Sequence, residues 1–568
     1  MIIKSYKEIM FLWHLRISFF ICFQYLLEVQ SIKSLSDDSF SKPEVIIIGA
    51  GASGIAAAQV LYEARINFLL MEADNEIGGR MKSHKFGQYI VENGANWIQG
   101  LHSEHNPSIN NPIWDFRNEY SIRGNVTDWD DYSMRTSNGD EVDYYTVDKW
   151  WEKFENTTSS CFKEGLRLHE NSKKEKEKTI EDISVEECFN RHGYGPNYPS
   201  NCERLIGETL KFYELESDDT IPSSNKSLMF GAIEYNNRLK CNEDFYFITE
   251  PRGYSIFLKE ISKPFMDSIR FGHEVVAINH NDNEVKVKVQ IMDDKYIDDG
   301  LKQRSKIDTL EINAKYAIST LPLGVLQKGK IKFSPPLSKN KQESIQKMKM
   351  GHYAKIYFQF PYAFWGQDEV LLILDESNLG LQSMALNLNH PKYFPGSNML
   401  TIHFVGDDAV RIESQNPEKT KSEIMQLLRG AFHGSIPNPI LMHVTNWTHN
   451  SYSYGSYSAI PIGFTLNMWE ELRKNAGRLY FSGEHTAEKF HATVHGAFET
   501  GKITAAKVLE EIKTAKVKPR ESVKGVTKDK MTATDLTSLA SIEIRISHRL
   551  MTSIFCLIVF INGISILK

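Results

Sequence analysis

Cysteine is scarce in this sequence and follows no regular pattern. Only six of the 568 residues are cysteines, and no two of them have the CxxC spacing. Two, Cys22 and Cys556, lie in hydrophobic segments near the ends of the chain, and the other four fall in one stretch: Cys161, Cys188, Cys202 and Cys241. Their wide and irregular spacing excludes a zinc site, so no bound metal is expected. In an exported protein these four could form two disulfides, with three possible pairings, and buried free thiols are the alternative.

The motifs of several enzyme classes are also absent. The sequence has no GxSxG, no HExxH, no phosphate-binding GKS/T loop and no cluster of His and Cys ligands. His485 and His495 are too far apart, and in contexts too unlike, to form a helical metal pair. The residues therefore offer no visible machinery for acid–base or nucleophilic hydrolysis.

No excess of positive charge is present. Lys and Arg number 66 against 72 Asp and Glu, which gives a formal net charge of −6. This balance argues against a protein built to hold nucleic acid. With 41% apolar and 24% charged residues, the composition is typical of a globular protein, and the length suits about two to four domains.

A hydrophobic segment lies near each end of the sequence, and the one near the start is shorter than the ~20 residues of a typical membrane span. The first, over residues 17–27, follows two lysines and predicts a secretory signal peptide over residues 1–34, with an uncleaved amphipathic anchor as the alternative. At the other end, a Lys- and Thr-rich linker over residues 513–549 precedes a hydrophobic tail over residues 550–568. That layout is typical of a GPI-attachment signal, and a C-terminal transmembrane helix fits nearly as well.

Four Asn-x-Ser/Thr sequons agree with export. They begin at Asn125, Asn156, Asn225 and Asn446, and none has proline in the middle. Together with the two ends of the chain, they predict passage through the secretory pathway to the outside of the cell or to its surface.

A dinucleotide-binding unit opens the folded part of the chain. An apolar run over residues 43–48 predicts a buried parallel strand, and the turn after it contains Gly49, Gly51 and Gly54. An alanine-rich helical stretch and a second apolar run follow, and that run ends at Glu72. The first glycine permits a tight turn, the second lets the backbone approach a pyrophosphate, and the third lets the helix pack against the strand. Glu72 lies about 20 residues on, where an acid accepts hydrogen bonds from ribose hydroxyls.

Further motifs follow this unit. They are Gly78-Gly79-Arg80, Gly94-Ala95-Asn96-Trp97, Gly483-Glu484-His485-Thr486 and Thr493-Val494-His495-Gly496. With the glycine turn, this set resembles the flavin-containing amine oxidase family, and within it the polyamine oxidases, over most of residues 43–512. The resemblance implies an α/β fold in which a Rossmann-like FAD-binding domain is interleaved with an α+β substrate-binding domain.

The resemblance also implies FAD as the cofactor and a binding site that is split in the sequence. The implied contacts are Gly49, Gly51, Gly54, Glu72, Arg80, Gly94, Ala95, Asn96, Trp97, Val275, Gly483, Glu484, Thr493 and Val494. Val275 would contact the adenine, with Val276 as an alternative. Either valine could equally be plain strand core.

Lys355 is the leading catalytic candidate. Residues 352–358 alternate as a strand does, with Ile356 and Phe358 on one face and Lys355 and Tyr357 on the other. A lysine in an apolar strand is costly unless its ammonium has a partner or is neutral. The family counterpart of this lysine holds a water beside the flavin, and a lysine that reaches the surface on its apolar stem is the alternative.

The substrate channel is predicted by the same resemblance. Tyr457 matches one aromatic wall, and Trp447 lies in a segment similar to the pocket lining. The plant-type enzymes have a tyrosine where this chain has Thr493 and a glutamate where it has Gln99. Glu214 is the expected acid of the channel, and Glu216 is an equally good candidate.

These assignments predict an interleaved body and an oxidase. The FAD-binding domain takes residues 43–120, 241–325 and 457–512, and the substrate domain takes residues 121–240 and 326–456. The expected activity is FAD-dependent oxidation of a polyamine, with oxygen as the second substrate and hydrogen peroxide as a product. The alternatives are another amine or an L-amino acid as substrate, or an FAD-binding surface protein without activity.

Overall fold

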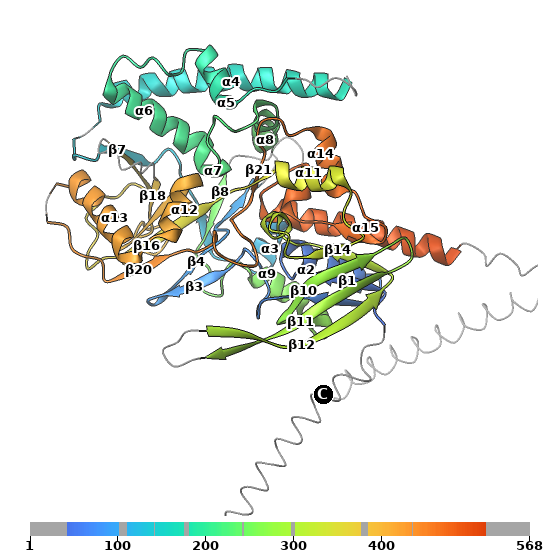
Figure 1. Ribbon diagram of the computed structural model, residues 1–568. Coiled ribbons are helices and arrows are strands. Elements are labelled where there is room, and N and C mark those ends of the chain that lie inside the picture. The colour runs from blue at the N-terminus through green and yellow to red at the C-terminus, as the bar shows by residue number, and fades with distance from the viewer. Residues whose placement is uncertain are drawn as a thin grey trace, which may run out of the picture. The chain divides into compact units, whose positions relative to one another are not determined.

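The strand before the glycine turn lies at the centre of a parallel sheet, and all four of its residues are buried. Figure 1 shows the computed structural model, which describes residues 42–101, 111–140, 142–174, 181–240, 244–296, 302–375, 384–433 and 435–517. The strands of this sheet, in spatial order, are β22 (Leu479–Phe481), β13 (Tyr316–Ser319), β1 (Val45–Ile48), β2 (Phe68–Met71) and β9 (Ile269–Arg270). Neighbouring strands are parallel, and the helix α2 (Ala52–Glu63) connects β1 to β2. The predicted strand–turn–helix–strand unit is formed.

A second sheet packs on one face of the parallel sheet. Its strands, in spatial order, are β12 (Lys302–Ala314), β11 (Val285–Tyr296), β10 (His273–His280) and β14 (Lys332–Ser334). Ile46 and Leu69 of the first sheet share one buried cluster with Val275 and Val287 of the second. All strands of these two sheets except β14 come from the three chain segments assigned to the FAD-binding domain. The short β14 lies just beyond the second of these segments.

A larger sheet is built from the intervening segments. Its strands, in spatial order, are β20 (Leu441–Val444), β16 (Tyr353–Gln359), β19 (Met399–Val405), β18 (Met384–Asn387), β17 (Val370–Leu374) and β7 (Tyr132–Thr136). Only β7, beside β17, is paired in parallel among these strands. The helices α12 (Gly406–Ser414) and α13 (Pro417–Ala431) share a buried cluster with Ile356 and Phe358 of β16. Lys355 and Tyr357 face the other way, as the alternation predicts.

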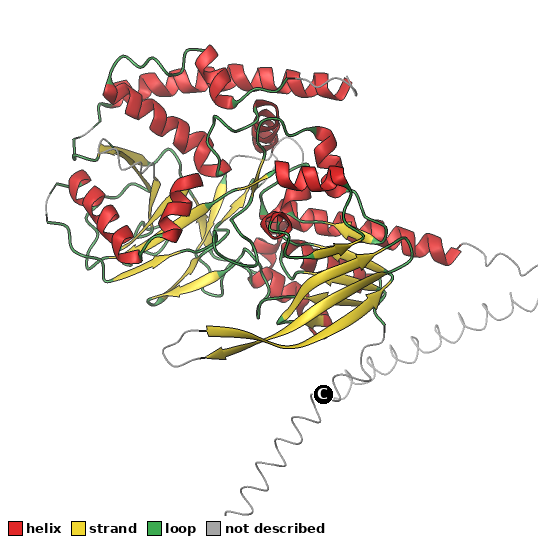
Figure 2. Ribbon diagram, viewed as in Figure 1, coloured by secondary structure: helices red, strands yellow, loops and turns green. Residues whose placement is uncertain are grey.

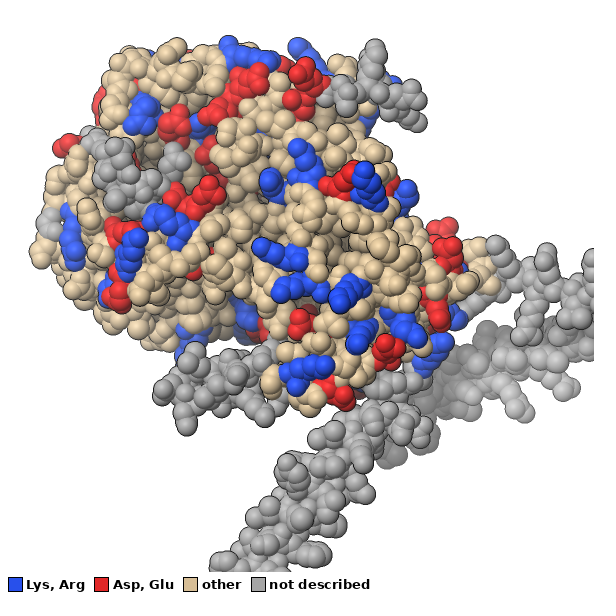
Figure 3. Space-filling model, viewed as in Figure 1, with Lys and Arg blue, Asp and Glu red and all other residues tan. Residues whose placement is uncertain are grey.

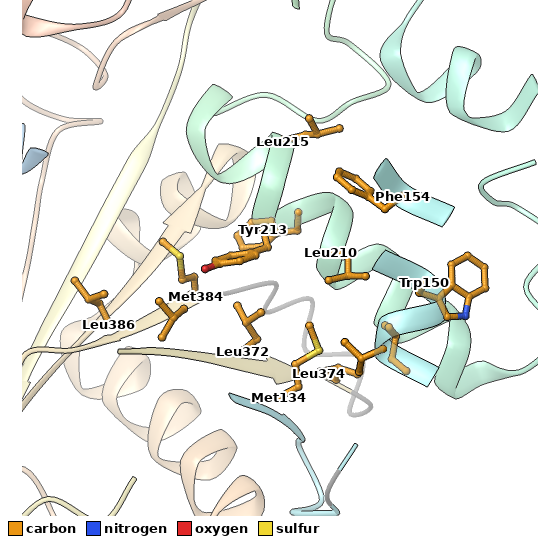
Figure 4. Packing of buried hydrophobic residues seen from close by; sticks show 14 of the residues in the cluster. Met134, Trp150, Phe154, Leu210, Tyr213, Leu215, Leu372, Leu374, Met384 and Leu386 are labelled. Carbon is orange, nitrogen blue, oxygen red and sulfur yellow. The ribbon is translucent and has the colours of Figure 1, made fainter. Parts of the chain in front are cut away.

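The opposite face of this sheet is covered by helices from residues 144–219. They are α4 (Tyr144–Lys174), α5 (Val185–Arg191), α6 (Asn201–Lys211), the π-helical turn η1 (Phe212–Glu216) and α7 (Ser217–Asp219). Figure 2 shows these helices in red along the upper part of the view. Figure 4 shows Trp150, Leu210 and Tyr213 from the helices packed toward Leu372 and Met384 of the sheet. This layer brings α4 and α7 close to the sheet that holds Lys355.

One of the possible disulfides is present among the described residues. Cys161 of α4 is bonded to Cys188 of α5, and both residues are fully buried. Cys202 is exposed on α6, and Cys241 lies outside the described residues. Of the three pairings open from the sequence, the one that remains for a second disulfide joins Cys202 to Cys241.

The other elements connect these layers. They are β3 (Ser83–Phe86), β4 (Tyr89–Glu92), β5 (Trp97–Gln99), α3 (Pro112–Glu119), β6 (Gly124–Val126), α8 (Leu228–Lys240), β8 (Phe245–Ile248), α9 (Ile256–Ser262), η2 (Lys263–Ser268), α10 (Leu323–Gln327), α11 (Lys339–Lys347), β15 (Lys349–Met350), β21 (Ser458–Ala459), α14 (Leu466–Arg473), η3 (Glu484–Thr486) and α15 (Val494–Val517). In the part of the chain that the structure describes, none of the helices has the length and apolar character that crossing a bilayer requires. The predicted signal peptide, most of the linker and the C-terminal tail lie outside the described residues.

Candidate functional site

One cavity of about 890 Å³ joins the glycine turn to the larger sheet. Its lining includes Gly49 and Gly51 at one end and Lys355 and Tyr457 further in. Residues from widely separated parts of the chain therefore meet around a single space. Most of the residues predicted for the site line this cavity, and Gly54 and Glu214 do not.

The glycine turn has the geometry that each glycine predicts. Gly49 has a φ of +103°, a conformation that side chains rarely adopt. A β-carbon on Gly54 would lie 1.8 Å from the carbonyl oxygen of Gly49. The start of α2 can therefore pack against the turn only with glycine at position 54. Around Gly51 the nearest atom to such a β-carbon is 4.0 Å away, which leaves open space before the N-terminus of α2. Backbone N–H groups and the positive end of the helix dipole at such a place favour a phosphate group.

Glu72 lies at the end of β2 and lines the same cavity. Its carboxylate accepts hydrogen bonds from the backbone N–H groups of Ala50 (2.6 Å) and Asp74 (2.7 Å). Burial raises its pKa to about 7, against the effect of these two hydrogen bonds. A carboxylate has about four lone-pair positions, so acceptor capacity remains for ribose hydroxyls. Val275 is buried and lines the cavity, whereas Val276 does not.

An ion pair joins two segments that lie far apart in the sequence. Arg80 Nη1 lies 2.9 Å from Glu484 Oε1 and also donates to the carbonyl oxygen of Ser456 (2.9 Å). The hydroxyl of Ser458 donates to the other oxygen of Glu484 (2.5 Å). Burial opposes ionisation of Glu484, but the Arg80 guanidinium, His485 and the Ser458 hydroxyl outweigh it and lower the pKa to about 2. This charged pair fixes the segment that carries Tyr457 beside the dinucleotide unit.

Lys355 is buried, which excludes the alternative of a surface lysine. Its ammonium donates to the backbone carbonyls of Glu92 (3.0 Å) and Gly94 (2.6 Å) and to the side-chain oxygen of Asn96. Burial lowers the pKa of Lys355 to about 7, although the Glu92 carboxylate acts in the opposite direction. The segment Gly94 to Trp97, predicted to contact the cofactor, is thus also the segment that holds the lysine.

The cavity has an aromatic wall near Lys355. Tyr457 and Tyr353 line it with ring centroids 6.2 Å apart, and burial raises the pKa of both phenols, so both stay protonated at neutral pH. Trp447 and Gln99 also line the cavity, as the resemblance implies. Sequence reasoning missed Tyr353, although its place two residues before Lys355 in an alternating strand could have indicated it.

Thr493 is in the lining, but its hydroxyl is used within the backbone. It donates to the carbonyl oxygen of Phe490 (2.6 Å) and accepts from the N–H of Gly496 (3.1 Å) at the start of α15. Phe490 and Ala492, which precede it, have φ values of 56° and 64°. The cavity wall at this place is a strained, tightly wound segment rather than an aromatic ring.

The acids of the cavity differ from those that the sequence predicts. Glu214 and Glu216 lie in the π-helical turn η1 and are not in the lining, and Glu216 instead accepts from the backbone N–H of Ser223 (2.8 Å). The lining contains Asp218 and Asp219 of α7 and Glu234 of α8. These side chains, missed in the sequence, place acidic groups on the wall of the cavity.

Comparisons with known proteins identify relatives along most of the chain. The profile of the family described as flavin containing amine oxidoreductase matches residues 52–509. Polyamine oxidase 1 of Zea mays is 29% identical over 475 residues, which cover 82% of this chain and 90% of that protein. Polyamine oxidase 6 of Oryza sativa subsp. japonica is 28% identical with the same coverage, and a lysine-specific histone demethylase 1 homolog of Arabidopsis thaliana is 26% identical over 85% of this chain and 54% of that protein.

Solved structures share the fold at low sequence identity. Cyclohexylamine oxidase from Brevibacterium oxydans has a TM-score of 0.61 at 18% identity and covers 83% of this chain and 100% of its own. Putrescine oxidase bound to putrescine has a TM-score of 0.60 at 16% identity and covers 82% and 99%. These likenesses confirm the predicted fold class, the mixed α/β fold of the amine oxidases.

Proposed function

Because the chain belongs to the family of flavin-containing amine oxidoreductases, with FAD as cofactor, we propose that its substrate is a polyamine such as spermine, spermidine or an acetylated form. The expected products are an aldehyde, a shorter amine and hydrogen peroxide. The observation that carries this proposal is the shared cavity, in which a buried lysine, two tyrosines and a group of acids lie beside the dinucleotide turn.

The protein groups at one end of the cavity suit FAD. The open space at Gly51, the N-terminus of α2 and the free lone pairs of Glu72 fit a diphosphate and a ribose. When bound there, FAD supplies the acceptor for a hydride from the amine and passes the electrons on to oxygen. The protein then has to position the amine, admit the one water that hydrolyses the imine and accept protons.

The other end of the cavity suits a long, flexible amine. Tyr353 and Tyr457 offer aromatic faces to a chain of methylene groups and its charged nitrogens. Asp218, Asp219 and Glu234 outnumber the lysine that two of them contact, Lys226, so this wall keeps negative charge for the ammonium groups of the substrate that do not react. Lys355 lies beside the reacting end, and its lowered pKa leaves part of the population neutral, so that it can take a proton from the water that hydrolyses the imine.

The names of the relatives support a polyamine over other amines. Two of those reported above are plant polyamine oxidases that align along most of their length. An L-amino acid would need an arginine for its carboxylate. The arginines in the described lining are already paired, Arg80 with Glu484 and Arg473 with Glu488, which disfavours that alternative.

We also propose that the protein enters the secretory pathway and acts outside the cell or at its surface. The proposal rests on the predicted signal peptide over residues 1–34, on the hydrophobic tail and on the sequons. All four sequon asparagines are exposed, and the Cys161–Cys188 disulfide suits an oxidising compartment.

Peroxide release from a panel of amines tests the proposed activity. The purified holoprotein is incubated with spermine, spermidine, their acetylated forms, a simple monoamine and a set of L-amino acids. The expected result is peroxide from one or more polyamines at a kcat/KM at least about tenfold above that for any other compound. Preferential oxidation of a monoamine or an amino acid would replace the proposed substrate, and a yellow protein that oxidises none of them would be an FAD-binding protein without amine oxidase activity.

A further inference from the structure

Four titratable residues form a cluster on the cavity wall, apart from the site around Lys355. They are Asp219 at the end of α7, Lys226 in the loop before α8, Glu234 on α8 and His491 in the segment before Thr493. All four line the cavity. The cluster therefore borders the same cavity as Lys355 and Tyr457.

Lys226 is the centre of this cluster, and its side chain is only 6% exposed. The ammonium binds the carboxylate of Asp219 and lies 3.6 Å from Glu234 Oε2. The other oxygen of Glu234 lies 3.1 Å from His491 Nδ1. Two carboxylates thus enclose one ammonium that belongs to the protein itself.

The chain makes room for the stem of this lysine. A β-carbon on Gly231 of α8 would lie 2.8 Å from Cε of Lys226, so a side chain at that position would displace the lysine. The backbone around Lys226 is also fixed, because the N–H of Ser227 donates to the carbonyl oxygen of Ile460 (3.2 Å). The ammonium is therefore held against the two acids rather than free to leave.

The cluster lies close to the aromatic wall. Thr220, next to Asp219, packs tightly on Gly351. A β-carbon added to Gly351 would lie 1.6 Å from the hydroxyl oxygen of Thr220. The N–H of Gly351 in turn donates to the carbonyl oxygen of Tyr457 (2.8 Å). On the other side, His491 precedes Thr493 by two residues. The cluster thus adjoins both the Tyr457 wall and the Thr493 wall.

We propose that Lys226 determines substrate specificity by occupying an ammonium site of the channel. Two carboxylates on the wall would attract a distal ammonium of a long polyamine, but here the protein supplies that ammonium itself. Asp219, Glu234 and Lys226 together carry a formal charge of −1, where the two acids alone would carry −2. The channel therefore favours amines with fewer distal charges, such as acetylated or shorter polyamines, over spermine. This inference rests on the proposed polyamine oxidation.

The test compares spermine with N1-acetylspermine, which differ by one ammonium group. Anaerobic mixing of holoenzyme with each amine, followed by the loss of visible flavin absorbance, gives an apparent Kd and a limiting rate. In K226M the apparent Kd for spermine, relative to that for the acetylated form, should fall by at least about tenfold, because the freed acids can bind the distal ammonium. The limiting rates should change little, since the cluster does not contact Lys355.

K226Q covers the case in which K226M does not fold, because the glutamine amide can still donate to Asp219. In K226Q the apparent Kd for spermine, relative to that for N1-acetylspermine, should also fall, by a smaller factor. K489M is the matched control, since Lys489 is an exposed lysine in the same lining and its loss should leave the ratio within about twofold. An unchanged ratio in both Lys226 variants that retain FAD, or an equal shift in K489M, overturns the inference. If the wild type oxidises neither amine, the proposed function fails and the inference fails with it.

Discussion

At the scale of single residues, the burial of the Lys355 ammonium carries a cost in free energy. Its ammonium is buried, and the groups that receive its hydrogen bonds are two backbone carbonyls and one amide oxygen rather than a carboxylate. A buried charge without a paired opposite charge is costly, and its pKa falls accordingly to about 7. Such a cost is retained at functional sites, where a perturbed lysine serves as an acid or a base.

Replacing Lys355 with methionine separates its chemical role from its structural one. K355M keeps a chain of similar length in the strand but removes the proton donor and acceptor, so kcat should fall by about 10²-fold. FAD content, measured as the ratio of visible to ultraviolet absorbance, should stay at the wild-type level. The control is K349M, because Lys349 is exposed on β15, and this variant should keep wild-type activity. Loss of FAD in K355M would contradict the assigned role.

The pH dependence of kcat reports the same lysine. A lysine with a pKa of about 7 is charged below pH 7 and neutral above it, so a step that needs the neutral amine speeds up as the pH rises through that value. We expect kcat of the wild type to increase between pH 6 and 8 and K355M to lack that limb. The pH dependence should be measured on kcat, because kcat/KM also depends on the protonation of the free substrate. Identical profiles in the two proteins would assign the limb to another group.

At the scale of secondary structure elements, local patterns predict some parts of the site well. The unit from β1 to Glu72 has its strand, glycines, helix and acid within 30 residues, so short-range sequence fixes its geometry. The alternation in β16 likewise predicts which face carries Lys355. The charged stretch over residues 281–306 suggests a hairpin, and β11 and β12 do pair in antiparallel fashion.

The acids of the channel could not be predicted in this way. The family resemblance offered Glu214 or Glu216 as the acid of the channel, but residues Phe212–Glu216 form a π-helical turn. A π-turn takes more residues than an α-turn, so it rotates all following side chains to new directions. The acids that line the cavity are instead Asp218, Asp219 and, from a different helix, Glu234. Neither the turn nor the approach of α8 has a signal in the sequence around Glu214.

The disulfide ties the helix that lines the cavity to its neighbour. Leu166, His169 and Lys173 of α4 lie in the lining, within a few turns of Cys161. In C161A/C188A the crosslink over 27 residues is lost, and the free energy of unfolding should fall by about 3 kcal/mol. Calorimetry measures this loss, and E155A, an exposed change on the same helix, should leave the melting temperature unchanged.

The same variant also tests whether the helix shapes the channel. Since α4 forms part of the wall but does not contact Lys355, KM for a polyamine should rise while kcat stays within about twofold. A fall in kcat with unchanged KM would show that the disulfide supports the reacting end of the cavity instead.

At the scale of the whole molecule, charges of both signs share the face shown in Figure 3. Lys and Arg lie close to Asp and Glu over much of the face shown in Figure 3, and many of them form ion pairs, as Arg411 does with Glu423 and Lys149 with Glu203. The acids that would attract a polyamine are inside the cavity, as Asp218, Asp219 and Glu234, and Lys226 offsets one of their charges. A whole-chain charge of −6 therefore gives no indication of the substrate, because the relevant acids are a small and local part of it.

The sequons give the sharpest test of where the protein is made. All four sequon asparagines are exposed: Asn125, Asn156, Asn225 and Asn446. One lies in a strand, one in a helix and two in loops, so they share no structural element. If the chain enters the secretory pathway, the full-length protein expressed in a eukaryotic cell should carry glycans at these positions and lose about 2–3 kDa per occupied site on enzymatic deglycosylation. An Asn→Gln change at each position should remove one step of that shift, whereas N67Q, an asparagine outside any sequon, should not. An unchanged mass, together with Cys161 and Cys188 recovered as free thiols, would contradict the proposed passage through the secretory pathway.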